Sequence, residues 1–262
     1  MECETDRSLA TTARTVDLAF AADPLIRWLR PYAAASSQPD STALKWQYRR
    51  VQSIMAHGTV LISAHVGQMM HEFPITKKEA VASQDSDTTP GKTAQLVCSE
   101  QVKSAEGQDA GAVVFLFPPK KQLDWSFSRL LMKCKVWALD LLDPVCDEGS
   151  KMKRIDKLMA AHSKSMQFLQ REYSGNLWYL EVVAVHPSLQ SRGIGRGVME
   201  EILEHIHRQP IYLECTREEN LGFYQSLGFR LIEEVELTDD EVHDETGRVK
   251  YWAMMRADES TS

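Results

Sequence analysis

The chain has 262 residues, of which 43% are hydrophobic and 26% are charged, a composition ordinary for a soluble globular protein. This length can bury a sizeable core, and we interpret residues 1–262 as a single domain. The 30 basic and 37 acidic residues give a net charge of −7, and no basic tract is present. We therefore expect no nucleic-acid partner.

The N-terminal segment MECETDRSLATTARTVDLAF carries acidic residues where a signal peptide has positive ones. No segment approaches the about 18 continuous apolar residues of a membrane span, so we expect no membrane association. The five cysteines form no C-x-x-C pair and are odd in number, which indicates free thiols and a cytoplasmic location. His65 and His71 lie near Glu72 but lack a third ligand at suitable spacing, so we expect no metal.

The first half of the chain is predicted to be mainly helical. Residues 16–30 favour a helix that is interrupted at Asp23-Pro24. Asp40 and Ser41 can cap a second helix that runs to about Met55. Residues 58–64 are β-branched and apolar, and this pattern fits either a strand or the packing surface at the end of that helix.

The middle of the chain contains a polar stretch and two expected strands. Residues at about 65–93 are predicted to include a mobile loop. Residues 93–99 and 111–117 have the pattern of strands. A long helical region follows, at roughly 125–142 and 150–171, with a break at Asp143-Pro144.

The last third alternates strands with helices. A β-α-β-α-β order implies that part of the sheet is parallel and that helices cover it. Gly228 is expected to end the second helix of this region. The expected strands are 177–185, 211–215, 229–237 and 249–255, and the expected helices are 194–207 and 218–227.

A glycine-containing turn lies between the first strand and the first helix of this region. Residues 180–197 read LEVVAVHPSLQSRGIGRG, so backbone N–H groups at the helix start are free to hold an anion. The phosphate-binding motif G-x-x-x-x-G-K-[ST] is absent. A dinucleotide motif G-x-G-x-x-G fails at Val198, although Glu214 lies about 20 residues on, as that motif requires. A tight turn without a ligand is the remaining alternative.

Two segments together resemble the GNAT superfamily of N-acetyltransferases. The turn resembles its acyl-CoA-binding motif Q/R-x-x-G-x-G/A at Gln190, Gly193 and Gly195, and NLGFYQSLGF at 220–229 resembles its N-x-x-x-Y-x-x-x-G-F block. The resemblance implies an α/β fold, the acyl-CoA N-acyltransferase fold, with a central mixed twisted sheet of about six or seven strands flanked by helices. It places the CoA-binding core at about 177–256. Over most of the chain, the layout is similar to the puromycin N-acetyltransferase-like branch.

The resemblance also implies roles for individual residues toward acetyl-CoA. Backbone groups of Val183 and Val185 would pair with pantetheine, and the Val183 N–H would stabilise the oxyanion. Asn220 would hold the pantetheine arm or cap the following helix. Arg192 and Arg196 would contact phosphate or lie in solvent. The implied cofactor-binding residues are Val183, Val185, Gln190, Ser191, Arg192, Gly193, Ile194, Gly195, Arg196 and Asn220.

Two side chains are catalytic candidates. By resemblance, Tyr224 would protonate the leaving thiolate, and the alternative is that it only packs its helix against the sheet. Glu181 lies in an otherwise apolar strand, where a carboxylate is costly unless it is paired or lines a cleft. We expect Glu181 to be the base for the amine, and the alternative is a position at the strand's rim. By strand alternation, Glu181, Val183 and Val185 would share one face.

These patterns favour an acetyl-CoA-dependent N-acetyltransferase that moves an acetyl group directly to the amine of a small molecule, such as a metabolite or an antibiotic-like compound. One alternative is the transfer of acyl groups to a hydroxyl, or of longer acyl chains. A second is a non-catalytic acyl-CoA-binding regulatory protein, and a third is a peptide or protein N-acetyltransferase. The intact motif residues favour an enzyme. The sequence names neither the acceptor nor the oligomeric state.

Overall fold

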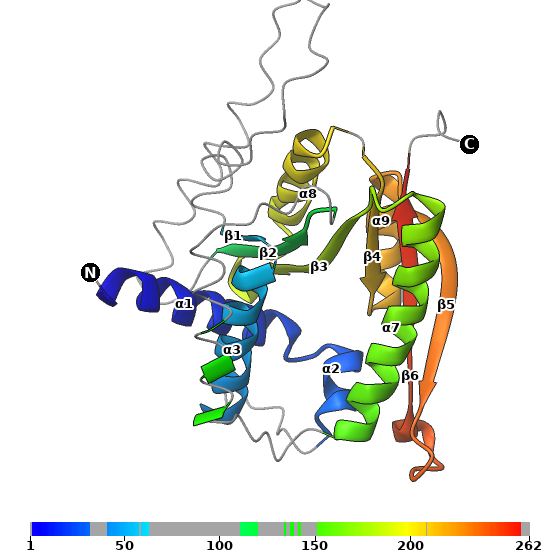
Figure 1. The fold of residues 1–262 in the computed structure, drawn as a ribbon, viewed down its shortest axis with the longest axis horizontal. Coiled ribbons are helices and arrows are strands. Elements are labelled where there is room, and N and C mark those ends of the chain that lie inside the picture. Colours follow the sequence, from blue (N-terminus) through cyan, green and yellow to red (C-terminus); the bar gives the residue numbers. More distant parts are fainter. Residues whose placement is uncertain are drawn as a thin grey trace, which may run out of the picture.

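In the part of the chain that the computed structural model describes, six strands form a mixed sheet with helices on both faces (Figure 1). The structure describes residues 2–31, 41–57, 59–62, 111–119, 134, 137–138, 141–142, 151–207 and 209–257. The strand order is β1-β2-β3-β4-β6-β5, in which β3 and β4 are parallel and the other neighbours antiparallel. The strands are β1 (Thr59–Ile62), β2 (Ala112–Phe117), β3 (Trp178–Val185), β4 (Ile211–Cys215), β5 (Arg230–Thr238) and β6 (Arg248–Arg256). The predicted α/β fold with a mixed sheet is confirmed.

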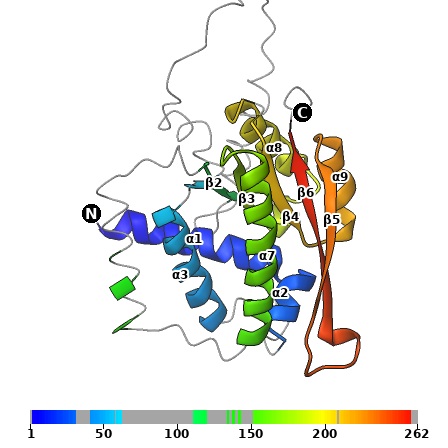
Figure 2. The same ribbon diagram turned by 45° about the vertical axis from the view of Figure 1, so that its right-hand side comes forward.

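The helices form a layer on each face of the sheet (Figures 1 and 2). Ala112 and Val114 of β2 pack in the core beneath α8, whereas Val113 and Phe115 pack in a second core with α1 and α3. Because successive side chains of a strand point to opposite faces, α8 lies on the face opposite α1 and α3. The α-helices with described bounds are α1 (Glu2–Phe20), α2 (Pro24–Leu29), α3 (Ser41–His57), α7 (Met152–Glu172), α8 (Ile194–His205) and α9 (Leu221–Ser226).

The first helix begins much earlier than the sequence pattern predicts. Helix α1 runs from Glu2 to Phe20, and the break before α2 confirms the predicted interruption. Asp23 caps α2, because its carboxylate accepts a hydrogen bond from the Ile26 N–H at 3.0 Å. The early turns were missed because their buried face includes small or polar residues such as Thr12 and Ala13, which produce a weak apolar pattern.

Strand β1 resolves the ambiguous segment near residue 60. Residues Thr59–Ile62 pair antiparallel with β2, so the strand interpretation of this segment is confirmed. Helix α3 ends two residues beyond the expected Met55, at His57. The expected strand at 93–99, the loop at about 65–93 and most of the expected helix at 125–142 lie outside the described residues.

A bulge in β3 changes the faces to which its side chains point. Phe115 of β2 pairs with Val182 and the next residue, Leu116, pairs with Leu180, so Glu181 is the extra residue. Leu180 and Val183 consequently pack on the same side, in the core beneath α8. Glu181 instead contacts α3. The prediction that Glu181, Val183 and Val185 share one face is therefore wrong, because it assumed uninterrupted alternation.

A buried ion pair fixes α7 to the β5–β6 hairpin. Arg154 Nε donates to Asp239 Oδ2 at 2.6 Å, and Arg154 Nη1 donates to the Trp28 carbonyl at 2.5 Å. Lys151 Nζ donates to the same Asp239 oxygen at 3.2 Å. These bonds anchor the start of α7, so the residues further along this helix are held over β3 and β4.

Candidate active site

The sheet opens between its two parallel strands. Strands β3 and β4 pair at only three positions, ending with Leu180 opposite Leu213. Beyond that pair, β3 continues along β2 to Val185 and β4 continues along β6 to Cys215, but they no longer pair with each other. Figure 1 shows the two strands running apart. We call this opening the fork, formed by residues 181–185 of β3 and residues 214–215 of β4.

Two backbone positions on β3 face the fork. The His186 N–H donates to the Gly111 carbonyl beside β2, so the backbone groups of residue 186 point away from the fork. Backbone groups alternate between the two edges of a strand, and Val183 and Val185 therefore present theirs to the fork. The Val185 carbonyl accepts a hydrogen bond from Gln190 Nε2 at 3.1 Å. An extended ligand would find a strand edge here.

Helix α8 begins with backbone N–H groups that have no partner among the described residues. Gly193 is its N-cap residue, with a φ of +79° and no side chain to cap the helix. The first bond of the helix runs from the Gly197 N–H to the Gly193 carbonyl, so the earlier N–H groups have no partner within the helix. The helix dipole adds positive potential at this end. A β-carbon on Gly195 would lie 3.7 Å from Val185 Cγ2, which places the helix start against the end of β3.

The two arginines of the turn differ in their contacts. Arg196 Nη2 donates to Ser226 Oγ at 2.6 Å, and its Nη1 lies 3.5 Å from the Glu200 carboxylate. The Ser226 contact ties the start of α8 to α9, whereas Glu200 lies in α8 itself. Within the described part of the chain, Arg192 makes no ion pair or hydrogen bond through its side chain and is exposed beside the helix start. Arg192 is thus the more available of the two for an anion.

Tyr224 lies on the face of the sheet that α8 covers, and Asn220 directly precedes its helix, α9. The half-buried ring of Tyr224 packs edge-on against Phe223 and Phe229, at centroid distances of 5.1 and 5.7 Å. Burial, together with the nearby Cys215, raises the pKa of Tyr224 above its ordinary value. Its hydroxyl has no hydrogen-bond partner among the described residues. Asn220 precedes α9 but makes no capping bond, so the capping alternative is wrong.

Glu181 is paired with a residue that sequence reasoning missed. Both Arg50 Nε and Arg50 Nη2 donate to Glu181 Oε1, at 3.1 and 2.5 Å. The two side chains are 25% and 21% exposed, so the pair lies at the edge of solvent. Arg50 belongs to α3 and is 131 positions away in sequence, and no local pattern joins it to β3. The expectation that Glu181 is paired or lines a cleft agrees with this arrangement.

A second carboxylate, that of Glu214, lies near Glu181 on the α7 face of the sheet and is surrounded by polar side chains. Glu214 of β4 accepts hydrogen bonds from Tyr212 at 3.0 Å and Tyr179 at 3.1 Å, and its Oε1 lies 3.0 Å from Nδ1 of His162 on α7. The His162 ring also packs on Tyr179 at 4.9 Å. Burial lowers the His162 pKa, but the hydrogen bond and charge of Glu214 and the charge of Glu181 leave it above its ordinary value. None of these contacts follows from sequence spacing.

The central part of this architecture matches a known domain. Residues 159–231, from α7 to the start of β5, match the model of the family described as the acetyltransferase (GNAT) domain. This segment is a GNAT acetyltransferase domain. The chain is therefore an acyltransferase, and GNAT enzymes take their acyl group from acetyl-CoA. The resemblance to the GNAT superfamily is confirmed, whereas the puromycin N-acetyltransferase-like branch is not.

Solved structures of several N-acetyltransferases are similar to this chain at low identity. The polyamine N-acetyltransferase of Drosophila melanogaster is 16% identical over 76% of this chain and 99% of its own, with a TM-score of 0.38. Arylalkylamine N-acetyltransferase 2 from Aedes aegypti is 13% identical over 81% and 95%, with a TM-score of 0.37. An N-acetyltransferase from Staphylococcus aureus Mu50 is 11% identical over 92% and 96%, with a TM-score of 0.37.

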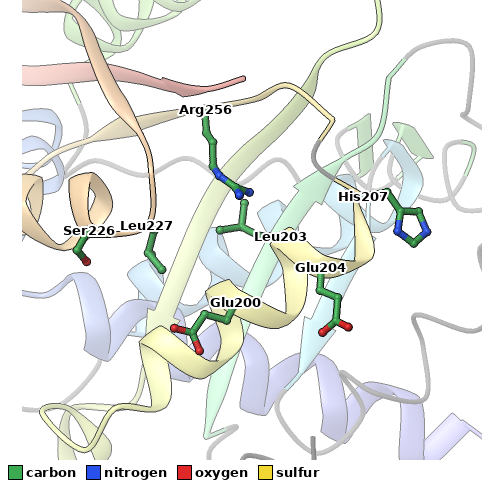
Figure 3. Close-up of a pocket in the computed structure, with 7 residues that line it drawn as sticks. All are labelled: Glu200, Leu203, Glu204, His207, Ser226, Leu227 and Arg256. Carbon is green, nitrogen blue, oxygen red and sulfur yellow. The ribbon is translucent and has the colours of Figure 1, made fainter. Parts of the chain in front are cut away.

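A surface pocket of about 580 Å³ lies away from the fork (Figure 3). Its polar lining mixes two glutamates of α8 with a histidine and an arginine, which does not match the anionic phosphates of CoA. It lies along the second half of α8, whereas the unpaired N–H groups lie at the helix start. We therefore keep the fork as the candidate site. The residues that line the pocket are Glu200, Leu203, Glu204, His207, Ser226, Leu227 and Arg256.

No helix in the described ranges combines the length and apolar character needed to cross a membrane.

Proposed function

We propose that this protein is an acetyl-CoA-dependent N-acetyltransferase that moves an acetyl group directly to the amine of a small molecule. One observation carries the proposal. The edge of β3 at Val183 and Val185, with which β4 does not pair, leads directly to the start of α8 at Gly193, which no side chain caps. This arrangement offers a strand edge for an extended arm and an anion site for a pyrophosphate within one continuous segment.

The residues at the start of α8 fit the phosphates of CoA. The N–H groups of Ile194, Gly195 and Arg196 point out of the first helical turn, where they can donate to phosphate oxygens. Ser191 and Arg192 lie in the same exposed turn. Gln190 is already bonded to the Val185 carbonyl, so we assign it to holding the turn against β3.

Acetyl-CoA supplies the acetyl group as a thioester when it is bound. Val183 and Val185 would hold the pantetheine arm through their backbone groups, as an added strand is held. The Val183 N–H is our proposed donor to the acyl oxygen as negative charge develops there. Asn220 is exposed and makes no capping bond, so we assign its amide to contact with the same arm.

Tyr224 is our proposed proton donor to the departing thiolate. It lies on α9, on the α8 side of the fork, and its raised pKa means that the hydroxyl keeps its proton through the neutral range. Its hydroxyl has no competing partner among the described residues. A tyrosine hydroxyl placed in this way can give up its proton as sulfur becomes negative.

The acceptor amine must lose a proton, and Glu181 is the candidate that the sequence indicates. The Arg50 bonds both go to Oε1 of this carboxylate. Oε2 is thus left to contact a cationic acceptor from the α3 side. We propose that Glu181 attracts the ammonium group of the acceptor, as a proton acceptor or as a fixed negative charge.

A panel of acceptors assayed for release of free CoA tests this proposal. We expect release with primary amines and none with matched alcohols. Release with alcohols alone would favour O-acyl transfer. Binding of acetyl-CoA without release for any acceptor would favour the non-catalytic regulatory alternative. Turnover with puromycin-like amines would support the puromycin N-acetyltransferase-like branch, and turnover only with simple alkylamines would argue against it.

A further inference from the structure

The two faces of the fork carry different chemistry. Glu181 and Glu214 are each the first residue after the last pair of β3 and β4, so both carboxylates flank the point where the strands part. On β4, Glu214 points toward α7 and contacts His162, while the next residue, Cys215, packs in the core with Tyr224. The proposed acid is therefore on one face of the fork and the carboxylates are on the other.

The contact with Glu214 orients the His162 ring, as a carboxylate orients the imidazole of a general base. Since Glu214 has only acceptor oxygens when ionised, His162 Nδ1 is the donor in their 3.0 Å contact. That assignment leaves Nε2 of the neutral ring as an acceptor. Nε2 bonds to no other described residue, and the side chain is 21% exposed. Tyr179 and Tyr212 in turn fix Glu214 through their hydroxyls.

Glu181 is poorly arranged for the same task. Arg50 donates two hydrogen bonds to its Oε1, so one oxygen of this carboxylate is already engaged by a cation. This arrangement suits a group that holds a charged acceptor. In contrast, protonation of His162 creates a cation next to Glu214 and near Glu181, which both carboxylates stabilise.

We propose that His162, oriented by Glu214, removes the proton from the ammonium group of the acceptor, and that Glu181 holds this group by its charge. The inference rests on the proposed acetyltransfer and names the base of that reaction. It also indicates the substrate class. Two carboxylates at the α7 side of the fork favour an amine that is basic enough to arrive as a cation.

The proposed reaction is balanced in atoms and protons, and it needs no further reactant. An N–H bond of the ammonium breaks, and its proton forms a bond to His162 Nε2. The amine lone pair then forms the N–C bond to the acetyl carbon as the C–S bond breaks, and the thiolate takes a proton from Tyr224. The amide nitrogen loses its second proton, which restores the Tyr224 hydroxyl through solvent. The proton on His162 passes to water, so one proton is released for each acetyl group transferred.

The groups around His162 set the expected pH dependence. The His162 ring faces Glu214 and Tyr212 of β4, and Tyr179 and Glu181 of β3. Because the pKa of His162 is raised, the imidazole becomes neutral, and so active as a base, only above its ordinary value of about 6.5. The kcat/KM for the acceptor should therefore rise with pH through a value above this one.

The experiment compares three variants of the full chain across pH, with acetyl-CoA and an active primary alkylamine. His162→Asn keeps a hydrogen-bond donor toward Glu214 but removes Nε2, and it should lower kcat/KM about 100-fold or more and remove the acidic limb. Glu214→Gln should shift the acidic limb to lower pH, because the neighbouring negative charge is lost. The matched control His243→Asn, at an exposed position between β5 and β6, should keep the wild-type profile.

The outcomes separate this inference from the proposed function. If the wild type releases no CoA with any amine, the proposed function fails. If the wild type is active and His162→Asn retains its rate and pH profile, only the assignment of the base is overturned. Should His162→Asn not fold, Glu214→Gln decides, because an unmoved acidic limb in that variant also overturns the assignment. Equal acetyl-CoA affinity in wild type and His162→Asn is required, since a loss there would indicate a structural role.

Discussion

Leu180 of β3 is paired with Leu213 of β4, and this pair is the last contact in register before the two parallel strands separate. Both leucines are 2% exposed in the core beneath α8. The point at which the sheet opens is therefore fixed by apolar packing. The leucine pair thereby also positions the two residues that follow it, Glu181 and Glu214.

Leu213→Ala should destabilise the fold and disturb the fork together. Truncating a fully buried leucine leaves a cavity and costs about 2–5 kcal/mol in the free energy of unfolding. The matched control is Leu231→Ala on β5, where the side chain is 48% exposed and the cost should be small. Denaturant unfolding measures the free energy of unfolding of both variants. Equal losses in the two variants would show that the leucine pair does not fix the fork.

Tyr224→Phe should lower kcat with little change in the affinity for acetyl-CoA. Loss of a positioned proton donor costs about 100-fold or more in rate, while the ring still packs against Phe223 and Phe229. Because burial raises the Tyr224 pKa, no alkaline limb from this residue is expected below its ordinary value of about 10.

The control for Tyr224 is Tyr251→Phe. Tyr251 is fully buried, and its hydroxyl has no partner among the described residues, so losing that hydroxyl should change neither rate nor stability greatly. Rates of free CoA release at saturating acetyl-CoA measure both variants. A Tyr224→Phe enzyme as fast as the wild type would rule out the proton-donor role.

Asp239→Asn should lower the thermal midpoint in a pH-dependent way. The Glu241 N–H, Arg154 and Lys151 hold the Asp239 pKa well below its usual range. A depressed carboxylate pKa stabilises the fold above the unfolded value of about 3.9, and this contribution is lost as pH falls through the folded value. The difference between wild type and variant should be largest near neutrality and shrink in acid.

The neighbouring Asp240→Asn provides the control for Asp239. The Asp240 side chain is 80% exposed and pairs with Lys157, whereas that of Asp239 is 6% exposed. Removing an exposed charge of this kind should leave the thermal midpoint nearly unchanged at every pH. A gap between wild type and Asp239→Asn that stays constant into acid would contradict the linkage argument.

The sequence was sufficient where structure is locally determined. The strand, turn and helix around Gly193 were predicted because the apolar run, the glycines and the helical periodicity all lie within one segment. The β5–β6 hairpin was predicted to within a residue at each end. Gly228 has a φ of +88°, which confirms its predicted place after α9.

The contacts on the α7 face of the fork could be found only from the structure. His162 lies on a helix with ordinary amphipathic spacing, and only the fold brings it to Glu214, 52 positions later. The bulge at Glu181 depends on the register between β2 and β3, which no local pattern fixes. Arg50 reaches Glu181 from α3 for the same reason. Long-range pairing thus decided which polar residues meet.

Isothermal titration with acetyl-CoA tests the central claim most directly, because the account depends on an anion site at the start of α8. The wild type should bind, and Gly193→Glu should not, since the substitution puts a negative charge against the pyrophosphate. Gly175→Glu is the matched control, because Gly175 has a similar φ of +74° and open space around it, far from α8 in sequence. Each of these substitutions strains the backbone by about 1–2 kcal/mol, so only the location of the charge differs. Binding by the wild type and Gly175→Glu but not by Gly193→Glu is the predicted result. No heat from the wild type at millimolar acetyl-CoA, or unchanged binding in Gly193→Glu, would contradict the account.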